Sequence, residues 1–198
     1  MKTQTIEMKK ASIYGAVLLG ALLLTSRSSY AQIKEKTAIV GEATMYPSKN
    51  IVENAINSKD HTTLIAAVKA AGLVETLSSA GLFTVFAPTN AAFEGLPGGT
   101  VDNLLKPENK KMLTDVLTYH VVAGYYTVQD IWALIAAGNG KAELKSVHGG
   151  KLIVWAKDKD LFLRDSKGNE AKITIGDVDQ SNGVIHVVDR VMMPSFSS

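Results

Sequence analysis

The feature that most constrains the fold is a change in hydrophobic period near residue 142. From about residue 50 to residue 138, apolar residues recur at helical spacing between capping residues and glycines. Short β-rich runs follow, separated by turn-forming clusters: AELKSV, KLIVWAK, DLFLRD, AKITIG and GVIHVVDRVMM. This order predicts an α+β fold, or a sheet sandwich with helices on one side. The repeated short strands favour a mostly antiparallel sheet over a doubly wound one.

Capping residues set the expected helix boundaries in the first part. Asp60 is placed to cap a helix that Gly72 ends, because a carboxylate can accept from the free amides of a first turn and glycine tolerates a left-handed C-cap. Pro107 is expected to start another helix, and Thr127 and Gly138 to begin and end a further one.

One strand interrupts the helical part, in the stretch FTVFAPTNAAF at residues 83–93. FTVF is expected to be a buried strand whose pairing ends at Pro88, because proline has no amide hydrogen to donate. Thr89 and Asn90 can accept hydrogen bonds from the free amides of a new helix, and Phe93 packs its first turn. The stretch is therefore predicted to join a sheet to helices.

The first 31 residues have the pattern of a secretory signal peptide. Lys9 and Lys10 precede an apolar run at residues 11–25, and Ser29 and Ala31 stand like the small residues before a cleavage site. The run is shorter than the ~20 residues that a spanning helix needs, which argues against an uncleaved anchor. We expect cleavage after Ala31, with translation starting at Met1 or Met8, and hence a secreted or periplasmic bacterial protein.

Removing this leader leaves a chain that is almost neutral. Residues 1–31 hold four basic side chains and one acidic, so the 21 basic and 19 acidic residues of the whole chain become 17 and 18 in residues 32–198. No basic patch remains to attract nucleic acid. The chain has no cysteine, so its core must be stable without disulfides. We interpret residues 32–48 as an N-terminal arm and residues 49–196 as one domain.

Three motifs resemble those of a fasciclin-like domain. They are TVFAPTNAAF at residues 84–93, the Tyr119-His120 pair, and GVIHVVDRVMMP at residues 183–194. The resemblance covers about residues 48–195 and implies a wedge in which a β-sandwich packs with several helices. It also implies a secreted adhesion module that is not an enzyme. The family motifs map onto Thr84, Phe86, Pro88, Thr89, Asn90, Phe93, His186 and Asp189, which we expect to be structural.

The Tyr119-His120 pair has two interpretations. Adhesion activity in some animal members involves this region, so the resemblance implies a partner-binding role for Tyr119 and His120. The alternative is structural. We expect the pair on a strand, where adjacent side chains point to opposite faces, so that one of the two faces the core with its polar atom bonded to backbone.

The sequence lacks the patterns of metal, calcium and catalytic sites. The four histidines are widely spaced and form no metal-binding pattern. DVDQSNG at residues 177–183 lacks the Gly and Glu of a calcium loop and reads as a hairpin turn whose Asn-Gly adopts left-handed backbone. No nucleophile elbow or phosphate loop is present. We therefore expect no metal, no cofactor and no catalytic residue.

The sequence thus favours a monomeric module that binds a protein or polysaccharide at a cell surface, matrix or envelope, with no stable membrane insertion after cleavage. The alternative is a soluble carrier of a small apolar ligand such as a pigment. In that case Trp132 and Trp155 would hold the ligand by burial and stacking, whereas both are core residues otherwise.

Overall fold

The computed structural model describes residues 36–195, so the predicted signal peptide lies outside the described residues. The helices are α1 (Ile51–Ala55), α2 (Thr62–Ala71), α3 (Val74–Ser78), α4 (Asn90–Glu94), α5 (Thr100–Leu104), α6 (Lys110–Tyr119) and α7 (Val128–Ala137). Short 3-10 turns lie at Lys59–His61 and Pro107–Asn109. Within the described residues, no helix has the length and apolar character that crossing a bilayer requires.

Two sheets contain the strands. A small sheet pairs β1 (Ala38–Val40) with β2 (Ala43–Met45). A seven-stranded sheet has the order β4-β3-β9-β8-β7-β6-β5. Its strands are β3 (Phe83–Pro88), β4 (Val121–Ala123), β5 (Lys141–Lys145), β6 (Lys151–Lys157), β7 (Asp160–Arg164), β8 (Glu170–Gln180) and β9 (Gly183–Val188).

The large sheet is mostly antiparallel, as the sequence predicts. Only the β3–β9 pair, next to the β4 end of the sheet, is parallel, with Phe86 opposite His186 and Pro88 opposite Val188. The sheet curls back on itself, since Val122 at its β4 end forms an isolated bridge with Ser146 beyond β5. The fold class is therefore α+β, with a strongly curved sheet in place of two separate ones.

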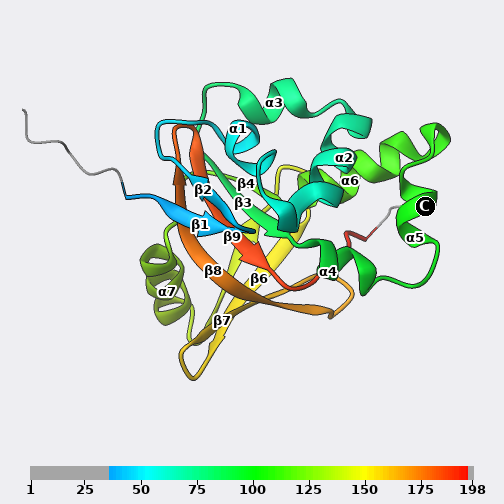
Figure 1. The fold of residues 1–198 in the computed structure, drawn as a ribbon. Helices are drawn as coiled ribbons and strands as arrows, with labels where there is room; N and C mark the ends of the chain where they lie inside the picture. The colour runs from blue at the N-terminus through cyan, green and yellow to red at the C-terminus, as the bar shows by residue number, and fades with distance from the viewer. Residues whose placement is uncertain (1–35, 196–198) are drawn as a thin grey trace, which may run out of the picture. The chain divides into compact units, whose positions relative to one another are not determined.

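The curved sheet separates two hydrophobic cores. Along β3, Val85 and Ala87 pack into one core and Phe86 into the other, because successive side chains point to opposite faces of a strand. Helices α1, α2, α3 and α6 cover the first core. Helix α7 lies apart from them and packs against β5 and β6 (Figure 1). The expectation of helices on one side therefore holds for all helices except α7.

The predicted arm contains ordered structure. In the small sheet, which lies within residues 32–48, Val40 and Met45 are each only 1% exposed and belong to the first core. Three-residue strands with a single inward-facing side chain give too short a period to be recognised in the sequence. The packed body of the domain therefore includes residues before position 49.

The helix boundaries agree with the predicted caps, with one exception. Gly72 adopts the left-handed C-cap conformation with φ 75°, and Thr127 forms a reciprocal capping box with Asp130. Pro107 begins a 3-10 turn that leads into α6. Asp60 does not cap α2, because it lies within the preceding 3-10 turn. The Asn90 side chain instead accepts from the amide of Thr63 at 3.0 Å.

Candidate functional site

The first family motif forms the junction between the sheet and the helices. The buried Thr84 hydroxyl donates to the Gly124 carbonyl at 2.8 Å and accepts from the Tyr126 amide at 2.9 Å. Thr89 caps α4 by accepting from the Ala92 amide at 3.2 Å, and Phe93 packs into the first core. These residues hold chain segments together.

His186 lies beside this motif on β9, opposite Phe86 of β3. Its ring stacks on Phe86 with the centroids 5.6 Å apart. Nδ1 accepts from the Asp177 amide at 3.3 Å, so Nε2 carries the proton and donates to the Tyr126 carbonyl at 2.8 Å. Burial lowers the pKa of His186. A neutral imidazole with both nitrogens occupied is a structural connector and has no free position for chemistry.

The Tyr119-His120 pair does not lie on a strand. Tyr119 is the last residue of α6, and His120 is its C-cap. Both side chains are buried: the Tyr119 hydroxyl donates to the Lys151 carbonyl at 2.6 Å, and His120 is held between the Val116 carbonyl and the Met192 amide. The expected opposite-face arrangement is absent because a helix ends here. The packing favours the structural interpretation of the pair.

Two buried polar residues that sequence reasoning missed organise the chain around these motifs. Asn182 accepts from the Ile51 amide at 3.0 Å and donates to the carbonyls of Leu77 and Ser79. It therefore joins the β8–β9 turn to α1 and α3. The backbone of Asn182 is not left-handed, although we expected this for an Asn-Gly turn. Asp177, at an irregularity in β8, does have a left-handed backbone, with φ 56°.

Asp165 is the second missed residue, and it fixes the β7–β8 turn. One carboxylate oxygen accepts from the amides of Lys167 and Asn169 at 2.9 and 2.8 Å. The other accepts from the Asn169 side chain at 2.9 Å and from the Met193 amide at 3.0 Å. An Asp in a polar turn is a weak signal in sequence, because most such residues are solvated. Here it ties the turn to the chain that follows β9.

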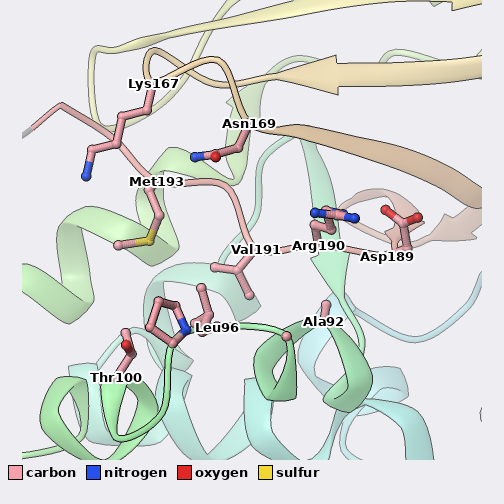
Figure 2. Close-up of a pocket in the computed structure, with 11 residues that line it drawn as sticks. Ala92, Leu96, Thr100, Lys167, Asn169, Asp189, Arg190, Val191 and Met193 are labelled. Atoms are coloured by element: carbon pink, nitrogen blue, oxygen red, sulfur yellow. The ribbon is translucent and has the colours of Figure 1, made fainter.

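That connection forms one wall of an open groove of about 570 Å³. Figure 2 shows its residues coming from three directions: the α4–α5 segment, the β7–β8 turn and the segment after β9. Val191 and Met193 point from the last of these toward Leu96 and Thr100 (Figure 2). The full lining is Ala92, Gly95, Leu96, Pro97, Thr100, Lys167, Asn169, Asp189, Arg190, Val191 and Met193.

The charged residues of the groove differ in how they are bound. The Asp189 carboxylate accepts from the Lys172 amide at 2.8 Å, which extends the β8–β9 pairing by a side-chain bond. Arg190 is exposed, and within residues 36–195 its guanidinium has neither a hydrogen bond nor an ion pair. It also lines a second, adjoining hollow with Asn169 and Asp189. The groove therefore presents a cation that the described part of the chain does not neutralise.

The two tryptophans of the carrier interpretation have different neighbours. Trp132 packs against the second core from α7. Trp155 stacks on Phe162 with ring centroids 4.8 Å apart, and the Arg164 guanidinium lies over its ring at 5.6 Å. An apolar cavity in the first core measures about 30 Å³, whereas ligand pockets measure about 300–1,000 Å³. That cavity is too small for a pigment.

No group of three or more His, Asp or Glu side chains in residues 36–195 is arranged to hold a metal ion. His61, His120 and His186 are buried, and burial lowers the pKa of each. For the described part of the chain, the groove is therefore the feature that best fits a functional surface.

Comparisons with known proteins agree with this fold. A family model described as the fasciclin domain matches residues 59–194. Protein sll1483 of the cyanobacterium Synechocystis is 47% identical over 160 residues, which is 81% of this chain and 82% of that protein. The cell surface glycolipoprotein MPB83 of Mycobacterium bovis is 36% identical over 122 residues, or 62% of this chain and 48% of that protein.

Among solved structures, the chain is similar to the FAS1 domain pair of the insect cell adhesion molecule Fasciclin I. The TM-score is 0.65 at 16% sequence identity, over 77% of this chain and 52% of that one. This similarity supports the fold, while the family model and the cyanobacterial relative match most of the sequence itself. The chain therefore belongs to the fasciclin domain family.

Proposed function

We propose that this protein is a secreted or periplasmic interaction module that binds a protein or polysaccharide at a cell surface, matrix or envelope. The observation that carries the proposal is the groove lined by α4, the β7–β8 turn and the segment after β9. Its apolar lining residues can be buried by a partner, and Arg190, which has no ion pair within residues 36–195, can bind a partner's anionic group.

The packing around the groove supports this role. Asp165 holds the β7–β8 turn and the Met193 amide in one hydrogen-bonded unit, and Thr89 caps the helix that forms the opposite wall. A groove built on fixed elements loses little conformational entropy when a partner binds. The names of two similar proteins, a cell surface glycolipoprotein and a cell adhesion molecule, are consistent with a surface-binding role.

The proposal also includes export with cleavage after Ala31 and action as a monomer. The protein secreted by its own host is the correct material for testing it, and its intact mass gives the cleavage site directly. A mass that matches residues 32–198 alone supports both cleavage at Ala31 and a ligand-free module. A reproducible additional mass of a few hundred daltons would instead support the carrier alternative.

Binding to host cells and to their extracted envelope tests the function itself. We expect saturable binding of the fluorescently labelled protein, and its loss in Thr100→Trp, because the indole fills the groove. Thr76→Trp is the matched control, since Thr76 is exposed on α3 and does not line the groove. Equal binding by both variants would contradict a role for the groove, and absence of saturable binding by the unmodified protein would contradict the function.

A further inference from the structure

The lining of the groove indicates which kind of partner it fits. Ala92, Leu96, Pro97, Val191 and Met193 give it an apolar character, and no aromatic side chain is part of the lining. Sugar rings are commonly held by stacking on aromatic faces, which the groove does not offer. Apolar side chains of a polypeptide, in contrast, bury well against aliphatic residues, and Met193 can adapt to their shape.

The aromatic pair on the outer face of the sheet does not supply the missing stacking surface. One face of the Trp155 ring is covered by Phe162 and the Arg164 guanidinium lies over the ring as well. Arg164 is in turn paired with Glu170 at 2.6 Å. The ring is therefore already stacked by neighbours from its own sheet. This leaves the aliphatic groove as the better candidate for recognition.

Charge adds a second requirement. Arg190 projects a guanidinium without an ion pair in residues 36–195, and Lys167 lines the same groove. The one carboxylate of the lining, Asp189, accepts from the Lys172 amide. A guanidinium is planar and binds carboxylates through two parallel hydrogen bonds. The groove thus favours a carboxylate next to apolar side chains.

From these observations we propose that the groove binds an acidic, apolar segment of a protein partner, with a carboxylate on Arg190 and an apolar side chain between Leu96 and Met193. This inference rests on the proposed function and narrows its partner from protein or polysaccharide to protein. The hydrogen bonds of Asp165 to the amides of Lys167 and Met193 hold the β7–β8 turn and the segment after β9 in fixed positions before binding.

Synthetic probes test this chemistry on the intact secreted protein. The first probe is a twelve-residue peptide that alternates Asp or Glu with Leu. Two further peptides replace every acid by Lys or every Leu by Ser, and short alginate oligomers represent an acidic polysaccharide. We expect the acidic, apolar peptide to bind tightest, with amide shifts at residues 92–100 and 189–193. We also expect its affinity to fall with added salt, since screening weakens exposed charge pairs.

Variants separate recognition from folding. Arg190→Glu is expected to weaken binding of the acidic, apolar peptide by about tenfold or more, because a like charge replaces the guanidinium. Lys145→Glu is an equal charge reversal at an exposed position outside the groove, and we expect it to leave the affinity for this peptide unchanged. Unchanged melting temperatures for both show that each variant is folded.

Several outcomes would overturn the inference: failure of every peptide to bind, tighter binding of alginate or of the basic peptide, or full affinity in Arg190→Glu. The proposed function is judged separately by binding to host cells. If Thr100→Trp abolishes surface binding while Arg190→Glu leaves it intact, the protein does bind the surface through the groove. The inference of an acidic partner segment then fails. If the unmodified protein does not bind the surface, the function itself fails.

Discussion

At the scale of single residues, His120 shows how a polar side chain can belong to the core. Its Nδ1 lies 2.8 Å from the Val116 carbonyl, and its Nε2 accepts from the Met192 amide at 2.9 Å. The ring therefore joins the end of α6 to the segment that lines the groove. Its sequence position next to Tyr119 indicated a motif, but only the fold shows that both polar atoms are used internally.

We expect His120→Ala to lower the free energy of unfolding by roughly 3 kcal/mol, because it leaves a cavity and two unpaired backbone groups. Urea denaturation measures this change. His148→Ala is the control, since His148 is only half-buried and its Nδ1 has no hydrogen-bond partner among the described residues. Loss of partner binding with unchanged stability in His120→Ala would contradict the structural role and revive the partner-contact interpretation.

The same residue makes stability depend on pH. Burial lowers the pKa of His120 from 6.5 to about 4. Above pH 6.5 the ring is neutral in both states and the effect is absent. As the pH falls from 6.5 toward 4, the unfolded chain binds a proton at this ring that the folded protein does not bind. The free energy of unfolding is therefore lower by about 2 kcal/mol at pH 5 than above pH 6.5.

His61 and His186 act in the same direction, because burial lowers the pKa of each. His120→Gln removes one of the three titrations, and its unfolding free energy should decline less steeply between pH 6.5 and pH 5 than that of the unmodified protein. Denaturation curves at several pH values give both slopes. Identical slopes would show that His120 is not excluded from protonation in the folded state.

At the scale of elements, Asn90 connects two helices that are separated in sequence. Its carbonyl oxygen accepts from the Thr63 amide in the first turn of α2, and its amide donates to the Lys59 carbonyl at 2.8 Å. Thr89 meanwhile caps α4, the helix that follows it directly. The polar pair after Pro88 thus caps one local helix and one distant helix.

Asn90→Ala is expected to destabilise the protein by about 1–2 kcal/mol, the usual cost of losing a helix cap. Hydrogen exchange of the Thr63 amide should accelerate, which global unfolding measurements alone do not reveal. Asn57→Ala is a matched control, because the exposed Asn57 side chain, in the turn after α1, donates to the Glu53 carbonyl of the adjacent helix and caps no helix N-terminus. If both variants lose equal stability, Asn90 does not cap α2.

The sequence predicted local features better than distant ones. The cap at Thr127, the C-cap at Gly72 and the antiparallel strand-rich half depend on neighbouring residues, and each is present. The sequence predicts Asp60 as the cap of α2, because only residues close in sequence can be recognised as caps. In the structure, the Thr63 amide of α2 donates instead to the Asn90 side chain. Likewise, the sequence predicts a strand at Tyr119 and His120, where α6 ends, because a helix end and a short strand have similar apolar patterns.

At the scale of the whole described domain, the groove depends on three segments that lie far apart in the chain: residues 92–100, 167–169 and 189–193. No pattern in any single segment identifies it, and Arg190 looks like an ordinary surface residue in sequence. The parallel pairing of β3 with β9 places the first and last motifs side by side. The groove forms where the chain leaves these two strands.

Cross-linking from inside the groove shows most directly whether a partner binds there. The chain has no cysteine, so Thr100→Cys introduces a single thiol that can carry a photo-cross-linker into the groove. Thr76→Cys carries the same group to α3, outside the groove. Incubated with the host envelope and illuminated, Thr100→Cys should form a discrete adduct with a protein, and Thr76→Cys should not. Equal adducts from both positions, or none from Thr100→Cys while the protein still binds the surface, would contradict the groove as the binding site.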